Sequence, residues 1–124
     1  MSELKFTSDH EWIRPEADGT CTVGITDHAQ EQLGDIVFVQ LPEVGRRIEA
    51  GDEAVVIESV KAAADVKMPV SGAIVTVNAV LVDAPETVNS DPLGAGWFIK
   101  ISPDAIEDLA GLLDQAAYDE LIGS

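Results

Sequence analysis

Basic residues are scarce in this sequence, in which 7 Lys and Arg stand against 23 Asp and Glu and the formal net charge is −16. A chain this negative repels phosphate, so we expect neither nucleic acid nor an anionic membrane surface as a partner. The same charge favours solubility and raises the rate of encounters with basic patches on other proteins. The composition therefore favours partner proteins.

Cysteine and long apolar runs are also nearly absent. Cys21 is the one cysteine, which rules out a disulfide within the chain and suits a reducing compartment. It lies in a strand-like run between two threonines, so we expect it to be buried. No stretch approaches the roughly 18 apolar residues that a membrane span needs, and the start Met1-Ser2-Glu3-Leu4-Lys5 has no apolar leader. We expect a cytoplasmic protein.

The patterns of common active sites are missing as well. The chain has no glycine-rich phosphate loop, no nucleophile elbow and no recognisable Ser-His-Asp arrangement. His10 and His28 have no Cys or His at ligand spacing, so we expect surface or capping roles for them rather than a metal site. These absences disfavour an enzyme, and most of the carboxylates are interpreted as a solvated surface.

Short strands separated by turn residues are what the sequence does contain. A length of 124 residues suits one domain over residues 1–124 with a single core. Runs of β-branched and aromatic residues between Gly, Pro and Asp-Gly turns are typical of a small sandwich or barrel. The predicted strands cover residues 5–7, 11–14, 20–25, 36–41, 53–59, 73–78 and 97–101.

A short internal helix is predicted after the third of these strands. Asp27 is expected to cap it, because an Asp side chain can accept hydrogen bonds from the free amides of the first turn. Gln30 occupies the capping-box position, and Gly34 follows Leu33 as a left-handed stop. The helix is therefore expected to end at Leu33.

A second helical segment is predicted near the end of the chain, over about residues 103–123. Ser102-Pro103 is interpreted as an N-cap followed by proline at the first helical position. Apolar residues then recur at roughly helical spacing, interrupted by Gly111 and restarted by Asp114 as a second cap. We expect this segment to pack against the sheet, and residues 83–96 to form a polar loop between strands.

Lys61 stands out because it has no polar neighbour in the stretch Val60-Lys61-Ala62. A weak internal repeat surrounds it: residues 42–45 and 69–72 share the form Pro-x-x-Gly, and each is followed by an alternating strand. We predict that Val60 and Lys61 form the tip of a hairpin whose arms are residues 54–59 and 63–68. Small alanines and the lack of an adjacent acid leave the ammonium unobstructed, so Lys61 is a candidate for covalent modification.

The stretch Glu58-Ser59-Val60-Lys61-Ala62 resembles the lipoyl-attachment hairpin of the glycine cleavage system H-protein family. The resemblance extends in order and spacing from about residue 5 to the end of the chain. It includes His10-Glu11-Trp12, residues 23–30, residues 33–39, residues 41–45, Pro69-Val70-Ser71-Gly72, Val88-Asn89-Ser90-Asp91-Pro92, Gly96-Trp97 and the closing Ala117-Tyr118-x-x-Leu121-Ile122-Gly123. That family is similar in fold to lipoyl and biotinyl carrier domains, which implies a mainly β barrel-sandwich hybrid of two small antiparallel sheets with added helices.

The resemblance implies that Lys61 carries lipoic acid through an amide on its ε-amine. The protein would then be a carrier of one-carbon metabolism rather than an enzyme. It would take an aminomethyl group from glycine decarboxylase to a tetrahydrofolate-dependent aminomethyltransferase, and electrons to dihydrolipoamide dehydrogenase. A lipoyl ligase or transferase would attach the group, and we expect the carrier to be a monomer.

Three acids join Lys61 as candidate site residues. Glu58 lies three positions before the lysine, on the strand face of residue 56, and we expect the lipoylating enzyme to contact it. The resemblance points to Glu11 and Asp65 as acids that line a cleft for the loaded arm, where carboxylates would keep the amine of the cargo protonated. A neighbouring family position that is often histidine is Gln32 here, which weakens a contribution from an imidazole.

Two other interpretations stay open from the sequence. Lys67-Met68 matches part of the Met-Lys-Met biotin motif, but Lys67 is expected on the returning strand, as a solvent-facing residue that discourages edge pairing. Alternatively, the domain is an unmodified scaffold or lipoate-relay protein of the same fold, because attachment signals are common to all lipoyl acceptors.

Overall fold

The computed structural model describes residues 4–123. Met1, Ser2 and Glu3, from the start that we expect to lack an apolar leader, lie outside this range. The strands form two antiparallel sheets, which confirms the predicted mainly β fold. One sheet has the order β1-β2-β3-β9-β8-β5 and the other has the order β4-β6-β7. The strands are β1 (Lys5–Phe6), β2 (Glu11–Pro15), β3 (Cys21–Ile25), β4 (Ile36–Gln40), β5 (Arg47–Ile48), β6 (Glu53–Ser59), β7 (Ala63–Lys67), β8 (Gly72–Val77) and β9 (Ile99–Pro103).

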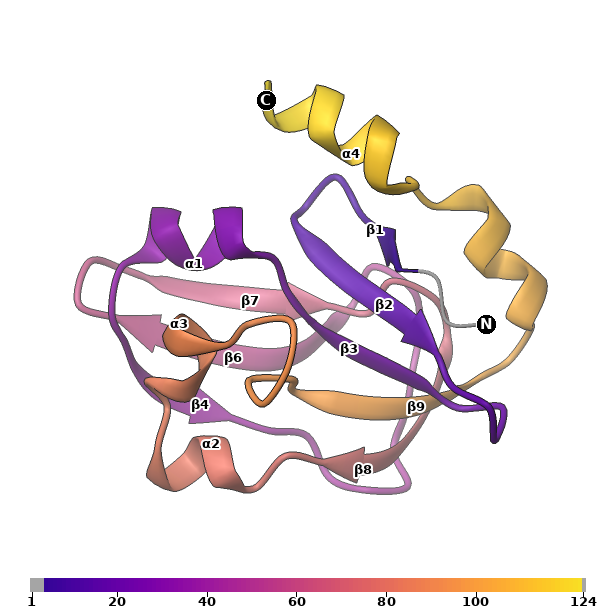
Figure 1. The fold of residues 1–124 in the computed structure, drawn as a ribbon. Coiled ribbons are helices and arrows are strands. Elements are labelled where there is room, and N and C mark those ends of the chain that lie inside the picture. Colours follow the sequence, from indigo (N-terminus) through magenta and orange to yellow (C-terminus); the bar gives the residue numbers. More distant parts are fainter. Residues whose placement is uncertain (1–3, 124) are drawn as a thin grey trace.

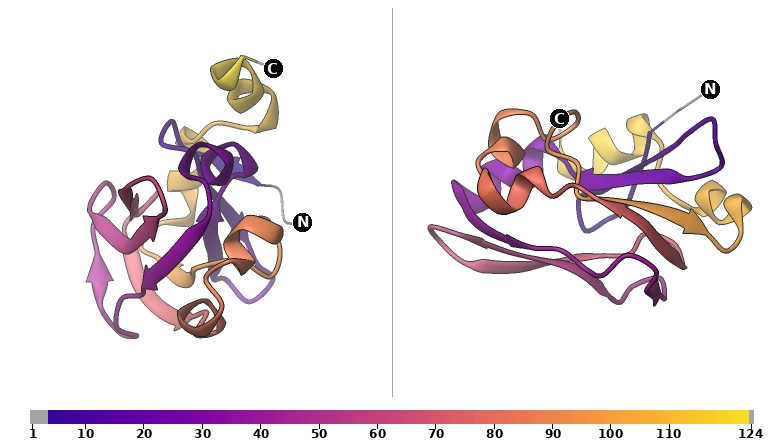
Figure 2. Two further views of the ribbon diagram at one scale, coloured as in Figure 1. Left: turned by 90° about the vertical axis from the view of Figure 1, so that its left-hand side faces the viewer. Right: turned by 90° about the horizontal axis from the view of Figure 1, so that it is seen from below.

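The two sheets pack face to face, and the core lies between them (Figure 1, Figure 2). Alternation along β6 and β7 turns Val55, Ile57 and Val66 inward, where they are almost fully buried. Burial of side chains of this size stabilises the fold by roughly 1.5–3 kcal/mol each. The body of the β6–β7 hairpin is therefore fixed by the core, while its tip extends to one end of the molecule (Figure 1).

Cys21 belongs to the same core. Its side chain is fully buried, as expected, and burial raises the pKa of the thiol to about 11, with Glu16 and Asp18 adding to the effect. Such a thiol stays protonated and unreactive at neutral pH. The role of Cys21 in the structure is packing.

The internal helix α1 (Asp27–Leu33) is present, but the predicted cap is wrong by one residue. Thr26 is the N-cap: its backbone is extended and its Oγ1 accepts a hydrogen bond from Ala29 N at 3.2 Å. An N-cap needs extended backbone, which Thr26 has directly after β3, whereas Asp27 already lies in the first turn. Gln30 consequently donates to Asp27 instead of forming a capping box. Gly34 ends the helix with φ of 78°, as predicted, although its ψ of −160° lies outside the left-handed helical region.

The predicted start of the C-terminal helices is also wrong. Ser102 and Pro103 belong to β9, opposite Ala73 and Gly72 of β8. Pairing between β9 and β3 ends at Ile101, so the missing amide of Pro103 costs that ladder nothing. A 3-10 helix, η1 (Ile106–Gly111), follows, and Asp114 caps α4 (Gln115–Ile122) as predicted.

The C-terminal segment packs on the body at two places. Leu109 of η1 enters the main core. Tyr118 of α4 is buried with Phe6 and Trp12 in a second apolar cluster beside β1 and β2. In Figure 1, α4 consequently stands over β1 rather than flat on a sheet. In the range 4–123 no helix is long and apolar enough to cross a membrane.

Residues 83–96 are not simply a polar loop. The single-turn helix α3 (Thr87–Ser90) lies within this stretch and buries Val88 in the core. A second single-turn helix, α2 (Val80–Asp83), ends at its first residue and buries Leu81. Helices of four residues are too short to produce an apolar periodicity that a sequence pattern could reveal. The sequence pattern also missed strand β5, because it has only two residues. This strand pairs with β8. The two strands next to the Pro-x-x-Gly segments therefore lie side by side.

Candidate functional site

The tip of the β6–β7 hairpin is a tight turn closed by one serine. Ser59 N donates to Ala62 O at 2.8 Å, and the Ser59 hydroxyl donates to the same carbonyl at 3.0 Å. Its Oγ also accepts from the amides of Lys61 and Ala62, each at 3.1 Å. These contacts fix the backbone of the turn, a use of serine that is common in turns. The predicted hairpin is confirmed, with Val60 and Lys61 at its tip.

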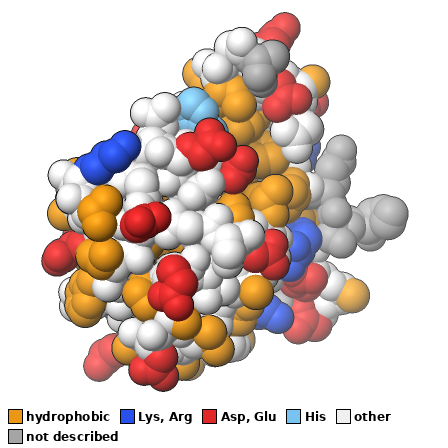
Figure 3. Space-filling view, turned by 60° about the vertical axis from the view of Figure 1, so that its left-hand side comes forward, with side chains coloured by type: hydrophobic (Ala, Val, Ile, Leu, Met, Phe, Trp, Pro, Cys, Tyr) orange, Lys and Arg blue, Asp and Glu red, His pale blue; other side chains and the backbone are white. Residues whose placement is uncertain are grey.

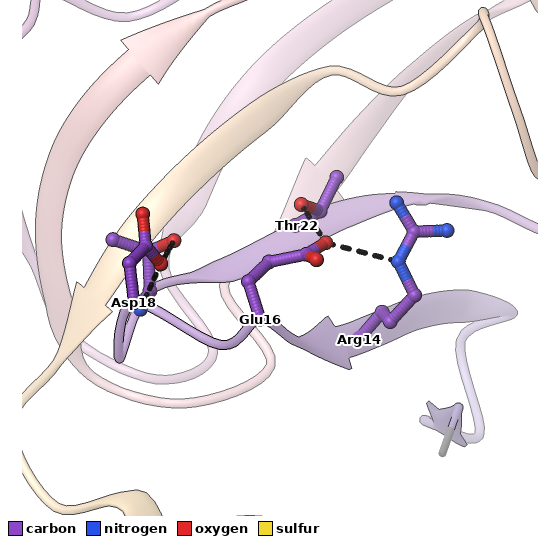
Figure 4. Close-up of polar contacts among 5 residues, drawn as sticks. Arg14, Glu16, Asp18 and Thr22 are labelled. Carbon is purple, nitrogen blue, oxygen red and sulfur yellow. Dashed lines mark hydrogen bonds and ion pairs between the residues drawn. The ribbon is translucent and has the colours of Figure 1, made fainter. Parts of the chain in front are cut away.

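Lys61 is exposed at this tip. Among the described residues, ion pairs join Arg14 to Glu16 and Arg47 to Glu49 and Asp104, so Lys61 takes part in none. The Arg14 pair lies at the β2–β3 turn, at the other end of the molecule, where Thr22 also donates to Glu16 (Figure 4). Figure 3 shows the end of the molecule that carries the hairpin, with scattered acidic side chains and few basic ones. The ammonium of Lys61 is therefore available.

Glu58 lies near the tip on the outer face of β6. Its neighbour Ile57 is buried while Glu58 is exposed, as alternation requires. Its register partners are Ala63 on β7 and Phe38 on β4, and Phe38 is itself 47% exposed. A protein that approaches Lys61 along β6 would meet the carboxylate of Glu58 and the ring of Phe38.

A cleft of about 200 Å³ lies between α1 and β7, beside the arms of the hairpin. Glu11 and Asp65 both line it, so the structure brings together the two acids that are far apart in the sequence. We call it the α1–β7 cleft. Its lining is apolar apart from these acids, Asp9, His10 and Gln32, and comprises Asp9, His10, Glu11, Ile25, Ala29, Gln32, Leu33, Ile57, Ala64, Asp65 and Val66.

Glu11 is a buried carboxylate with partners on both oxygens. Its exposed fraction is 3%. Oε1 accepts from Thr7 Oγ1 at 2.9 Å, and Oε2 accepts from Lys67 N at 3.0 Å. Burial raises the pKa of Glu11, while the hydrogen bonds from Lys67 and Thr7 oppose the increase. Glu11 therefore ties β2 to β7 as well as lining the cleft.

Asp65 is exposed on β7, next to another acid. A hydrogen bond with the Asp65 carboxyl group, together with its charge, raises the pKa of Glu53 on the adjacent strand. Asp9, Glu11 and Asp65 give the α1–β7 cleft three carboxyl groups, and no Lys or Arg side chain lines it. Such a cleft suits an apolar chain that ends in a cation.

His10 and His28, separate in the sequence, are neighbours in the structure, with ring centroids 4.8 Å apart. His10 is the one non-glycine residue with positive φ, 71°, among those described. Its Nδ1 lies 2.8 Å from Tyr118 Oη, which lies 2.7 Å from Thr26 Oγ1. Burial and then His28 lower the pKa of His10, while Asp9 opposes them.

Sequence analysis did not place His10 in the cleft, because its contacts with α1 and α4 are long-range. Asp9 was missed for the same reason, since nothing at its own position distinguishes it from the other acids. In residues 4–123 no group of three or more His, Cys, Asp or Glu side chains is arranged to hold a metal ion.

A family model described as glycine cleavage H-protein matches residues 4–124 of this chain. The chain belongs to this family. It is 59% identical over 121 residues to the glycine cleavage system H protein of Shigella dysenteriae serotype 1, covering 98% of this chain and 94% of that protein. It is 57% identical over 117 residues to the same protein of Teredinibacter turnerae, covering 94% and 90% respectively.

A solved H protein shares the fold. The crystal structure of a glycine cleavage system H protein from Mycobacterium marinum matches with a TM-score of 0.89 at 45% identity, over 98% of each chain. The barrel-sandwich fold predicted from the sequence is thereby confirmed. Lys67, the residue of the biotin alternative, is exposed at the end of β7, opposite Glu53, so it lies on an edge strand as predicted and not at the hairpin tip. Membership of the H-protein family disfavours both the biotin and the scaffold interpretations.

Proposed function

We propose that this chain is the lipoyl-bearing carrier of a glycine cleavage system and that Lys61 is the attachment residue. One observation carries the proposal: in a member of the H-protein family, Lys61 is exposed and without an ion pair at the tip of a turn that Ser59 closes. Lysine suits this role because its amine forms an amide and its long stem is flexible.

The residues present fit a lipoyl group. The small side chains of Ala62 and Ala63 leave space beside the ammonium of Lys61. The α1–β7 cleft offers an apolar lining with carboxylates, which suits an apolar arm loaded with an amine. When bound, the lipoyl dithiolane supplies a sulfur that accepts the one-carbon unit and a pair of thiols that carries two electrons.

The chain's own residues position the lysine and protect the amine of the cargo. Ser59 holds the turn, so that the amine of Lys61 is offered from a fixed backbone. Glu58, on the same outer face, is the contact that a lipoyl ligase or transferase uses to recognise the hairpin. Glu11 and Asp65 favour the protonated form of an amine in the cleft, because an opposite charge nearby raises the pKa of an amine. Each pKa unit gained corresponds to about 1.4 kcal/mol in favour of the ammonium.

The partners are enzymes of the same system. Glycine decarboxylase loads the carrier, a tetrahydrofolate-dependent aminomethyltransferase unloads it, and dihydrolipoamide dehydrogenase reoxidises it. The net charge of −16 supports fast and weak docking to each, since long-range attraction raises association rates without a large interface. We place the carrier in the cytoplasm as a monomer.

The experiment compares Lys61→Arg with the matched control Lys67→Arg. Arginine keeps the charge of lysine, but its guanidinium stays protonated and accepts no acyl group. Each variant is incubated with a lipoyl ligase and then assayed for glycine–bicarbonate exchange with glycine decarboxylase. We expect no lipoylation and no exchange for Lys61→Arg, and nearly parental values for Lys67→Arg. Exchange supported by the Lys61 variant would overturn the assignment.

A further inference from the structure

Asn89 in α3 makes three side-chain hydrogen bonds, and all of them reach the segment that runs from α1 into β4. Its Oδ1 accepts from Ile36 N at 2.8 Å. Its Nδ2 donates to Gly34 O and to Gln30 Oε1, each at 2.9 Å. Three of the four hydrogen bonds that an asparagine amide can make are thus used on one segment. The neighbouring Val88 is fully buried in the core, so the helix that presents Asn89 is anchored.

The segment that Asn89 holds supports the hairpin tip. We call residues 34–36 the platform. Val60 N donates to Asp35 O at 3.0 Å, and Ile36 is the register partner of Ser59. The stem of Lys61 lies over Gly34, where a Cβ atom would be 3.3 Å from Lys61 Cε. The tip therefore rests on the platform through its backbone and through the stem of the lysine.

Other contacts hold the two ends of the platform: Gly34 N donates to Gln30 O at 3.0 Å, and the Ile36 side chain is buried in the core. The backbone between these ends is less regular. Gly34 adopts a positive φ, and the pairing of β4 with β6 is irregular between Ile36 and Phe38. The carbonyls at the end of a helix lack partners within the helix, and here Asn89 supplies one for Gly34 O. Without the Asn89 amide, Gly34 O and Ile36 N would lose these partners, and the backbone of Asp35 between them would be less constrained.

We propose that Asn89 is a positioning residue for Lys61. Through the platform it holds Val60 and Lys61 in one orientation, so that an enzyme that acylates the lysine meets a preformed shape. The inference rests on the proposed function of Lys61 and extends it to α3, a region to which the sequence analysis assigned no chemistry. Asn89 is not among the residues that line the cleft, and its side-chain bonds reach Gln30 and residues 34–36 rather than Lys61.

The test compares Asn89→Ala with Asn78→Ala. Asn78 is a matched control, because its amide also bridges backbone carbonyls, those of Ala95 and Trp97, each at 2.8 Å. The first measurement is amide hydrogen exchange in the unmodified proteins, with Met68 N, which donates to Asp52 O, as an internal reference. We expect Asn89→Ala to speed exchange at Val60 N about fivefold or more relative to Met68 N, the effect of losing an ordinary hydrogen bond. Asn78→Ala should leave this ratio unchanged.

The second measurement is kcat/KM of a lipoyl ligase for each variant, alongside a thermal melt. We expect a severalfold lower kcat/KM for Asn89→Ala and a parental value for Asn78→Ala, even where the two melting temperatures fall equally. If Asn89→Ala does not fold, Asn89→Asp replaces it: this variant keeps the acceptor for Ile36 N but loses both donors, so the same effects are expected.

The outcomes separate the two proposals. An unchanged exchange ratio at Val60 N, or equal effects of the two alanine variants on kcat/KM, would overturn the positioning role. A parent protein that the ligase does not modify would instead contradict the proposed function. The exchange measurement tests Asn89 in either case, since it needs no lipoyl group.

Discussion

Replacing Glu11 by Gln separates the structural role of this residue from its charge. In the parent, both carboxylate oxygens accept hydrogen bonds, from Thr7 Oγ1 and from Lys67 N. A glutamine amide of nearly the same shape can keep the contact with Lys67 N, which its Oε1 accepts. Its Nε2 faces the Thr7 hydroxyl oxygen, which already accepts from Asp9 N at 3.3 Å and from Glu11 N at 3.2 Å, so this second contact is weakened. Glu11→Gln should therefore fold normally while it removes one negative charge from the α1–β7 cleft.

Two opposing effects set the change in stability. Exchanging charge-assisted hydrogen bonds for neutral ones costs about 1 kcal/mol. Against this, burial raises the pKa of Glu11 above its ordinary value of 4.5, which means that ionisation of the buried carboxyl opposes folding. Each unit of this increase corresponds to about 1.4 kcal/mol. At pH 7 the two effects act in opposite directions, so the variant should lose less stability than the weakened hydrogen bonds alone would cost.

The pH dependence has a definite sign. The folded parent binds the Glu11 proton more tightly than the unfolded chain, so its stability from this group is complete below pH 4.5 and is lost as the pH rises to the folded pKa. Glutamine does not titrate. The free energy of unfolding of Glu11→Gln, relative to the parent, should therefore increase as the pH rises above 4.5 and then become constant.

Urea unfolding at several values between pH 4 and pH 8 measures this difference. Glu11→Leu is the comparison: it leaves Lys67 N without a partner and should lose about 1–3 kcal/mol more than the glutamine variant. A relative stability of Glu11→Gln that stays flat or falls over this range would refute the reasoning about the raised pKa. Equal stabilities of the two variants would refute the role of the hydrogen bonds.

Three further expectations concern the hairpin, the cleft and α1. Glu58→Ala should slow lipoylation of Lys61 in a timed ligase reaction while shifting stability by only about 0.5 kcal/mol; equal rates for variant and parent would exclude a contact with the ligase. Glu11→Gln combined with Asp65→Asn should still accept lipoate but release ammonia and formaldehyde faster at neutral pH, without the folate enzyme; parental retention would exclude these acids as the protecting pair. Thr26→Val should cost about 1–2 kcal/mol in chemical unfolding, because it removes the cap of α1 and the contact of Thr26 Oγ1 with Tyr118 Oη. An unchanged stability would contradict a stabilising role for either contact.

The hairpin could be predicted from the sequence because its signals are local. Alternating apolar residues, turn residues and an isolated Lys61 all lie within a short stretch, and the core confirms the alternation at Val55, Ile57 and Val66. Asp114 was recognisable as a cap for the same reason. The choice of Asp27 over Thr26 failed because both residue types cap helices well, and the end of β3 decides between them.

A pattern in one sequence does not predict contacts between residues that are far apart in the chain. The meeting of His10 with His28 and Tyr118 depends on how α4 and α1 pack beside the start of β2. Family resemblance alone indicated that Glu11 and Asp65 line one cleft. The bonds of Asn89 to the platform join residues more than 50 positions apart, and no local signal marks them.

The central claim is that Lys61 carries a lipoyl group in the cell. The most direct measurement is the intact mass of the protein purified from its native cells, followed by peptide mapping of the modified residue. A mass increase equal to one lipoyl group, located on Lys61, is the result that this account predicts. A protein of unmodified mass from cells that are actively cleaving glycine, or a modification located on Lys67 instead, would contradict it.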